Sequence, residues 1–252
     1  MKLNWMVAWS LDASLVLLAY FWALNRVIDA EVPMRFYLML GAGVWAGYMG
    51  DRIFDVLRRP DITRYSERHR KVDSSKWRWM FLWCSVVAFL VTAGLCLLEP
   101  MLYLRGWMLA CGAAVYVFMG SLIRDQGIRK WIKKVSAACL LMVSPWVFDF
   151  EQMTREGFVF AALFGFLVLL NLLMVDRSEG SDPWGWKRTY SLVAFSGVLS
   201  WFLDPLSMAV TLVFCWLYFR FEETEQFSIN ANKRVALDFG LLVYCLMIGG
   251  MH

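Results

Sequence analysis

The stretch LNLLMVDRSEGSDPWGWKRT, residues 170–189, begins as part of an apolar helix and ends as a polar loop. Its apolar run ends at Val175 and meets Asp176, and Glu179 and Asp182 follow shortly after. A bilayer core accommodates about 20 consecutive apolar residues of a helix. The stretch therefore predicts the end of a membrane-spanning helix, with carboxylates gathered at one surface of the bilayer.

The composition of the whole chain agrees with this interpretation. The chain has 252 residues, of which 60% are hydrophobic, whereas a soluble domain is usually about 45–50% apolar. We expect an all-α polytopic membrane protein that forms a single domain over residues 1–252. Because several apolar stretches are shorter than a comfortable span, we expect those helices to continue into the polar loops or to be tilted. The nine predicted spans are residues 5–25, 34–49, 78–98, 101–121, 134–149, 157–175, 189–203, 205–220 and 235–251.

The basic residues are distributed unequally between the two sets of predicted loops. Of the 25 Lys and Arg residues, 21 fall at the N-terminus and in the loops after the second, fourth, sixth and eighth spans. Positively charged loops are retained on the cytoplasmic side. We therefore expect an integral protein of a bacterial inner membrane, with its N-terminus in the cytoplasm and its C-terminus outside. The net charge of +4 then reflects topology and contact with membrane lipid, and we expect no nucleic-acid partner.

A first acidic cluster follows the second predicted span, in GDRIFDVLRRPD, residues 50–61. Asp51 and Asp55 are four residues apart, so both carboxylates lie on one face if the helix continues through them. Two carboxylates side by side suit Mg²⁺ that is held together with substrate phosphates. The alternative is a solvated helix end, at which Asp55 pairs with Arg58 or Arg59.

The second acidic cluster, in residues 176–182, follows the sixth span on the same predicted side of the membrane. Taken alone, it is explained by an acidic loop. Two clusters at equivalent points of the chain predict instead that carboxylates face each other across a cavity and hold Mg²⁺ ions that bridge a diphosphate. Between them, RDQGIRKWIKKVS, residues 124–136, places Lys133 and Lys134 at the start of the fifth span. These lysines either anchor the helix at the membrane surface or clamp a diphosphate.

Two further acidic residues, Asp12 and Asp238, lie inside the first and ninth predicted spans. A charged side chain at the bilayer centre costs about 2.5–3.5 kcal/mol, and the predicted topology places both residues toward the cytoplasmic side, where the cost is smaller. They either line a cavity, or pair with basic residues or cap neighbouring helices.

Three patches of the sequence resemble the UbiA superfamily of intramembrane prenyltransferases. GYMGDRIFDVLRR is similar to the end of the first aspartate-rich motif of the family, N-D-x-x-D-x-x-x-D. LMVDRSEGSDPWGWKRT is similar to the second motif, and KKVSAACLLMVSPWV is similar to the basic start of the fifth helix. The chain departs from the family at Gly47 and Tyr48, where the first motif has Asn-Asp, and at Gly180, where an acid is usual.

The resemblance implies a ring of nine transmembrane helices around a central cavity that is roofed by the polar loops. It implies a Mg²⁺-dependent prenyltransferase that moves a polyprenyl group from its diphosphate to a lipophilic acceptor, often an aromatic one. Two other functions stay open: a non-catalytic lipid- or quinone-binding membrane protein of the same fold, and a small transporter. The implied site residues are Asp51, Asp55 and Asp176 for catalysis and metal binding, Glu179 and Asp182 as further metal ligands, and Arg52, Arg59, Lys133, Lys134 and Lys187 for the diphosphate.

Overall fold

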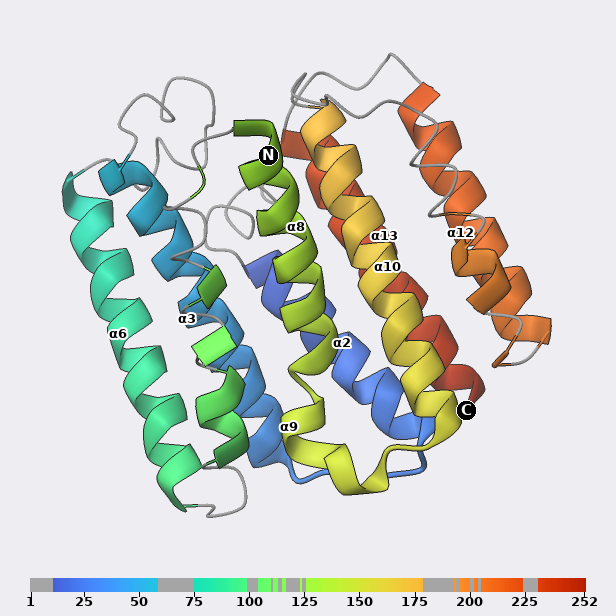
Figure 1. The fold of residues 1–252 in the computed structure, drawn as a ribbon, viewed down its shortest axis with the longest axis horizontal. Coiled ribbons are helices and arrows are strands. Elements are labelled where there is room, and N and C mark those ends of the chain that lie inside the picture. The colour runs from blue at the N-terminus through green and yellow to red at the C-terminus, as the bar shows by residue number, and fades with distance from the viewer. Residues whose placement is uncertain are drawn as a thin grey trace.

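The computed structural model describes the chain as a bundle of helices (Figure 1). Within the described residues it contains no strand, which confirms the all-α prediction. The described residues are 11–58, 75–98, 104–109, 111–112, 115–116, 123, 126–178, 193, 195–199, 202–203, 205–223 and 231–252. The helices are Leu11–Val27 (α2), Met34–Arg58 (α3), Ser75–Leu98 (α6), Gln126–Val143 (α8), Trp146–Asp149 (α9), Arg155–Ser178 (α10), Pro205–Glu223 (α12) and Ala231–Met251 (α13), with a short 3-10 helix, Phe150–Gln152 (η1).

Helix α3 reaches further than the second predicted span. It does not stop at residue 49 but continues to Arg58. Asp51 and Asp55 therefore lie on one continuous helix, one turn apart, as expected for neighbouring carboxylates on one face.

Helix α8 differs from the fifth predicted span at both ends. The span was expected at residues 134–149, but α8 begins at Gln126 and ends at Val143. Lys and Arg are good helix formers, so the basic segment joins the helix instead of preceding it. At the other end Pro145 follows, and its ring and missing N–H do not allow the helix to continue.

Helix α10 begins at a hydrogen-bonded cap. The backbone N–H of Gly157 donates to Oγ1 of Thr154 over 3.2 Å, as in a standard N-cap. Among the described helices, the segment Arg155–Leu173 of α10 is the one that is long and apolar enough to cross a membrane. The arrangement of nine spans therefore stays a prediction.

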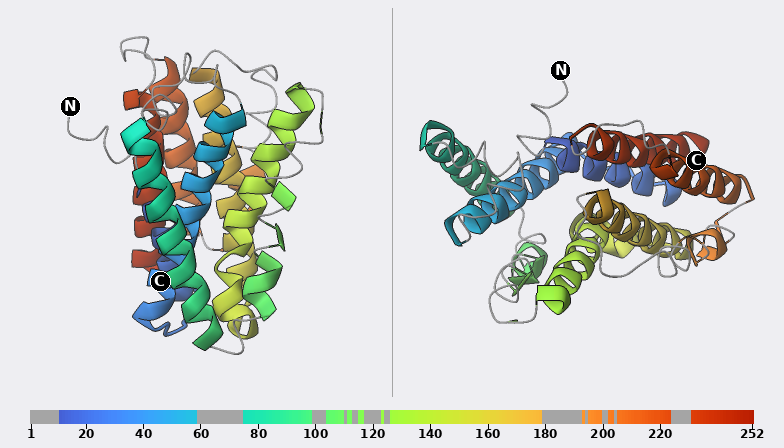
Figure 2. Two further views of the ribbon diagram at one scale, coloured as in Figure 1. Left: turned by 90° about the vertical axis from the view of Figure 1, so that its left-hand side faces the viewer. Right: turned by 90° about the horizontal axis from the view of Figure 1, so that it is seen from above.

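The helices form two rows, which Figure 2 shows from above. In the first row α6, α3, α2 and α13 follow one another, each packed against the next, and α12 packs against α13. In the second row α8 packs against α10, and α10 also contacts α2 and α13 of the first row. The first and last of the long described helices, α2 and α13, are therefore direct neighbours.

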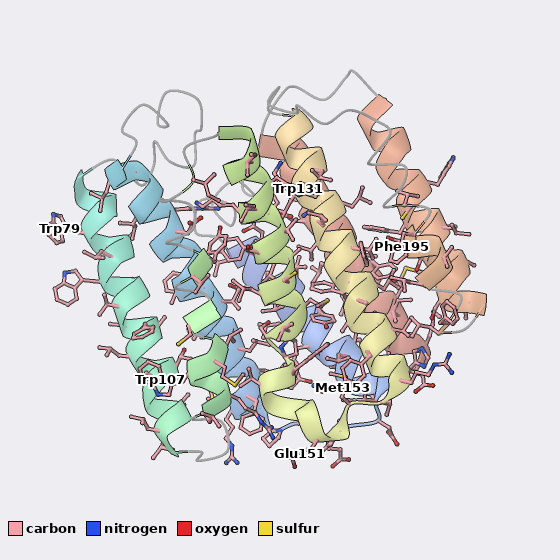
Figure 3. All side chains as sticks on the ribbon, in the orientation of Figure 1. Trp79, Trp107, Trp131, Glu151, Met153 and Phe195 are labelled. Atoms are coloured by element: carbon pink, nitrogen blue, oxygen red, sulfur yellow. The ribbon has the colours of Figure 1, made fainter. Side chains whose placement is uncertain are left out.

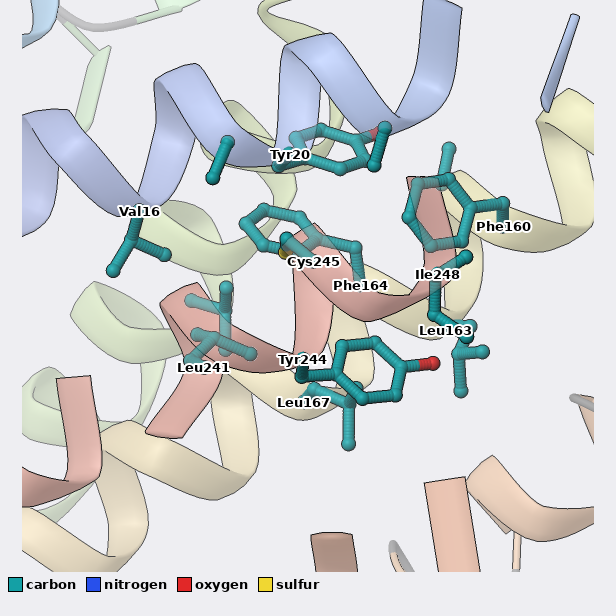
Figure 4. Packing of buried hydrophobic residues seen from close by; sticks show 14 of the residues in the cluster. Val16, Tyr20, Phe160, Leu163, Phe164, Leu167, Leu241, Tyr244, Cys245 and Ile248 are labelled. Carbon is teal, nitrogen blue, oxygen red and sulfur yellow. The ribbon is translucent and has the colours of Figure 1, made fainter. Parts of the chain in front are cut away.

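Aromatic side chains pack both between the two rows and within the first row. Tyr20 of α2 stacks on Phe164 of α10, with ring centroids 3.7 Å apart, and Phe160 lies beside it (Figure 4). Phe214 of α12 packs against Tyr244 of α13, with ring centroids 5.2 Å apart. Such pairs contribute about 0.5–1.5 kcal/mol beyond the area that they bury. The cluster therefore ties α2, α10, α12 and α13 into one packed unit.

Helices α2 and α13 approach each other closely at Gly249. A methyl group at this position would lie 2.8 Å from Cα of Ala23 and 2.5 Å from Cζ3 of Trp22. The two helices run in the same direction (Figure 1), so this contact sets their register. Asp238 precedes Gly249 by as many residues as Asp12 precedes Ala23. Since the rise per residue is the same in both helices, the two acidic residues lie at the same level of the bundle.

Large apolar side chains cover the outside of the bundle. Trp79 and Trp83 of α6 are 62% and 64% exposed, and Figure 3 shows Trp79 projecting away from the other helices. Soluble monomers rarely expose contiguous apolar patches larger than a few hundred Å². Here the exposed apolar residues extend over several helices, and they include Phe89 and Leu90 of α6, Leu206 and Trp216 of α12, and Phe239 and Met247 of α13.

Candidate functional site

Asp51 of α3 and Lys133 of α8 form an ion pair. The Lys133 ammonium donates to Oδ1 of Asp51 over 3.1 Å. The Asp51 side chain is 22% exposed and the Lys133 side chain 24% exposed, so solvent screens the pair only in part. Both residues were predicted to belong to the site, and the fold brings them together although 82 positions separate them in the chain.

Tyr116, in the short helical stretch of residues 115–116, contacts both members of the pair. Its hydroxyl donates to Oδ2 of Asp51 over 3.4 Å, which is long for a hydrogen bond between oxygens. The centre of its ring lies 5.5 Å from Nζ of Lys133, within the range of a cation–π interaction. Tyr116 was not predicted, because one tyrosine in an apolar stretch carries no motif. Asp51, Lys133 and Tyr116 are called the acid–lysine cluster below.

The acid–lysine cluster lies toward the end of the bundle at which α3 and α10 end and α8 begins (Figure 1). We call this the site end. Asp176 is in the last turn of α10, so the two acid-bearing helices end on the same side, as predicted. The side chains of Asp55 and Asp176 lie outside the described part of the structure, as do Arg59, Glu179, Asp182 and Lys187 entirely. The meeting of the two acidic clusters across a cavity therefore stays a prediction.

Three other residues near Asp51 bear on the predicted site. Arg52 is buried, with 5% of its surface exposed, and buried guanidinium groups are retained only beside polar partners. Lys134 is partly exposed on α8, so it is more accessible to an anion than Arg52. Gly47 lies one turn before Asp51, and a methyl group there would meet no described atom within 4 Å. Among the described residues, none obstructs a larger side chain at this position of α3.

A second polar contact lies inside the packed core. Nδ2 of Asn171, on α10, donates to Oδ1 of Asp238, on α13, over 2.7 Å, and both side chains are buried. Asp12 is also buried, with 8% of its surface exposed, and it lies at the level of Asp238. Asp238 therefore has a hydrogen-bond partner in the amide of Asn171, whereas its predicted pairing with a basic residue stays a prediction. Burying a carboxylate without hydrogen bonds is costly, so Asn171 stabilises Asp238 in the core.

The chemistry of the acid–lysine cluster fits a metal with a phosphate. A carboxylate provides the hard oxygen that Mg²⁺ prefers, and an ammonium neutralises a phosphate oxygen. Among the described side chains, no group of three or more His, Cys, Asp or Glu could hold a metal ion. A Mg²⁺ site would therefore consist of Asp51 together with carboxylates such as those of Asp55 and Asp176.

Compared with protein-family models, with curated proteins and with solved structures, the chain matches none of them. Membership of the UbiA superfamily stays a prediction that is based on the three sequence patches.

Proposed function

We propose that the chain is an integral membrane prenyltransferase of the UbiA type, which uses Mg²⁺ to move a polyprenyl group from its diphosphate to a lipophilic acceptor. The observation that carries this proposal is the contact between Asp51 and Lys133. It joins an acid suited to a metal and a cation suited to a phosphate at one end of a helical bundle. The surface of that bundle is apolar on several sides, as a protein that takes its substrate from the bilayer requires.

Membrane insertion is supported by the apolar segment of α10, and the length and exposed face of α6 agree with it. Helix α6 has 24 residues, which corresponds to about 36 Å at 1.5 Å per residue, and the hydrocarbon core is about 30 Å thick. Its exposed face is rich in tryptophan and aliphatic residues, which a bilayer would cover. Arg26, Arg35 and Arg155 lie at the ends of α2, α3 and α10 that are opposite to the site end. The small number of basic residues at those ends supports the prediction that the site end faces the cytoplasm.

The proposed roles follow from charge. Asp51, Asp55 and Asp176 bind the metal, with Glu179 and Asp182 as further oxygen donors. Mg²⁺, when bound, supplies Lewis-acid stabilisation of the leaving diphosphate. The cationic side chains neutralise the charge that develops on the diphosphate as the bond to the prenyl carbon breaks; they are Lys133, Lys134, Arg52, Arg59 and Lys187.

Binding of geranyl diphosphate to the purified protein in lipid nanodiscs tests the proposal. Titration calorimetry with Mg²⁺, and again with EDTA, should show binding that depends on the metal. Asp176→Asn keeps the shape of the side chain and removes its charge, so it should weaken the Mg²⁺-dependent binding at least about tenfold, because Mg²⁺ has few protein ligands. Asp182→Asn should have a smaller effect. Glu151→Gln is the matched control, since it removes one acidic charge at the end of the bundle opposite to the site end (Figure 3).

Two results would count against this proposal in different ways. If the parent protein shows no metal-dependent binding, the transferase function is wrong and the lipid- or quinone-binding alternative replaces it. If the parent binds and Asp176→Asn binds equally well, the metal site has been assigned to the wrong residues.

Gly47→Asn offers a test by gain of function. The substitution adds an amide oxygen one turn before Asp51, at a position where no described atom lies within 4 Å of an added methyl group. It restores the asparagine that the first motif of the UbiA superfamily has. We expect the Mg²⁺-dependent affinity for geranyl diphosphate to increase, while the affinity in EDTA stays unchanged. The matched control is Gly50→Asn, at which an added methyl group also meets no described atom within 4 Å. Gly50 directly precedes Asp51, so its side-chain direction is turned about 100° around the helix axis from that of Asp51.

A small transporter is the second candidate, and the buried acids favour it. Asp238 and Asp12 lie at one level of the core, and Asn171 binds Asp238. Acidic residues inside membrane bundles often mark ion or proton pathways. Proton flux into proteoliposomes that enclose a pH-sensitive dye separates the two candidates. Proton flux that Asp238→Asn abolishes would support the transporter function. Absence of flux in the parent protein would exclude a proton transporter and leave the transferase function as the remaining one of the two candidates.

A further inference from the structure

The proposed function assigns new partners to both charges of the acid–lysine cluster. Asp51 would bind Mg²⁺ and Lys133 would bind the diphosphate, yet the two side chains bind each other at 3.1 Å. An anion that approaches Lys133 therefore meets an ammonium whose charge Asp51 already offsets. A metal ion that approaches Asp51 likewise meets a carboxylate that an ammonium already offsets. Each ligand alone has to compete with the ion pair.

Tyr116 stabilises the paired arrangement from two sides. Its hydroxyl donates to the Asp51 oxygen that does not contact Lys133, and its ring faces the Lys133 ammonium. About three quarters of each charged side chain is covered by protein. The pair is therefore more persistent than an ion pair between two long, fully exposed side chains. Lys133 nevertheless carries its ammonium on a flexible stem and can turn to a new partner.

We propose that the Asp51–Lys133 pair, held by Tyr116, couples metal binding to diphosphate binding. This inference rests on the proposed function. A metal ion on Asp51 releases Lys133 for the anion, and an anion on Lys133 releases Asp51 for the metal. By linkage, each ligand then raises the affinity for the other by the same factor. Because of the pair, the protein binds the metal and the diphosphate together more tightly than it binds either one alone.

The coupling predicts an effect that would not be expected if Asp51 were only a metal ligand. Removing the charge of Asp51 should raise the affinity for geranyl diphosphate in EDTA, because Asp51 then no longer offsets the charge of the Lys133 ammonium. We expect a gain of about fivefold, in line with the strength of a partly exposed ion pair. The same Asp51→Asn variant should bind less tightly than the parent protein when Mg²⁺ is present. Lys133→Gln should have the mirror effect and raise the affinity for Mg²⁺ alone.

A double-mutant cycle separates this pairing from a general effect of charge. If Asp51 only repels the anion at a distance, Asp51→Asn should give the same gain in the Lys133→Gln background. If the gain comes from the released lysine, it should disappear in the double variant. Tyr116→Phe keeps the ring under the ammonium and removes the hydroxyl, so it should give a smaller gain in EDTA, of about twofold.

The experiment measures geranyl diphosphate binding in EDTA and in Mg²⁺, and Mg²⁺ binding alone, for the parent protein, the two single variants and the double variant in nanodiscs. Thermal unfolding of each variant verifies that it is folded, and the two single variants test the coupling independently. A gain in EDTA for Asp51→Asn that depends on Lys133 supports the coupling. Metal-dependent binding by the parent protein without that gain would overturn the coupling and leave the proposed function intact. No metal-dependent binding by the parent protein would overturn both.

Discussion

Asp51 and Asp238 are carboxylates that the same bundle holds in two different ways. Asp238 is buried and accepts a hydrogen bond from the neutral amide of Asn171 over 2.7 Å. Asp51 is 22% exposed and pairs with the Lys133 ammonium over 3.1 Å. A buried acid that loses its partner is left unsatisfied in a medium of low polarity, whereas a partly exposed one can exchange partners. Changes around Asp238 should therefore act on folding, and changes around Asp51 on ligand binding.

The largest loss of stability is expected at the helix contact that positions Asp238. Gly249→Ala forces a methyl group against the backbone of α2 at Ala23, and overpacking of this kind lowers the free energy of unfolding by about 2–3 kcal/mol. Gly250→Ala is the matched control, because a methyl group there meets no described atom within 4 Å. Reversible unfolding in mixed detergent micelles measures both. Equal effects of the two substitutions would contradict the close contact of α2 and α13.

A somewhat smaller loss is expected from Asn171→Leu. It removes the amide that donates to the buried Asp238 carboxylate, and an unsatisfied buried acceptor costs about 1–3 kcal/mol. Adding Asp238→Asn should recover part of the loss, because a neutral amide is easier to bury than a carboxylate. The same unfolding assay measures both variants. A double variant that is as unstable as Asn171→Leu alone would mean that the Asp238 charge does not cause the loss.

Asp51→Asn should change the free energy of unfolding by less than about 1 kcal/mol. The pair that it breaks is partly exposed, and such pairs contribute little to folding. Its main effect should appear in the binding titrations. Instability comparable to that of Asn171→Leu would show that the acid–lysine cluster belongs to the folding core, and the contrast with Asp238 would be lost.

The smallest effect is expected from the ion pair at the other end of the bundle. Arg105 pairs there with Glu151, whose side chain is 69% exposed. Glu151→Gln should change the free energy of unfolding by less than about 0.5 kcal/mol and leave diphosphate binding unchanged. A change in binding would show that distant charge alone controls the affinity, and the local explanation for Asp51 would fail.

The sequence predicted the helical class and the position of Asp176 at the end of an apolar helix because both depend on local pattern. Apolar runs gave most of the helices, and the continuation of α3 through Asp51 and Asp55 was expected because the apolar stretch before them is short for a span. The boundaries of α8 were missed because its basic residues were assigned to a loop, although they favour helix. Hydropathy identifies where a chain is apolar, but it does not locate a helix end in a charged segment.

The partners of the acids were less predictable, because they depend on the packing of distant segments. Nothing in the chain links Asp51 to Lys133 or Tyr116 before the helices are placed. Asn171 did carry a signal, since it is a lone amide in the apolar run of α10. A polar residue inside a predicted span calls for a partner, and Asp238 in the ninth predicted span was the natural candidate. Pairing the two would have predicted that α10 packs against α13.

The central claim is that carboxylates at the site end hold a divalent metal against a diphosphate, and a paramagnetic metal tests it most directly. Mn²⁺ accepts the same oxygen ligands as Mg²⁺. Electron paramagnetic resonance of the protein in nanodiscs, with Mn²⁺ and geranyl diphosphate, should show protein-bound Mn²⁺ with hyperfine coupling to ³¹P. In Asp51→Asn and Asp176→Asn the bound signal should be strongly reduced, whereas Glu151→Gln should retain it. No protein-bound Mn²⁺ in the parent protein, or a signal that both aspartate variants retain in full, would contradict the claim.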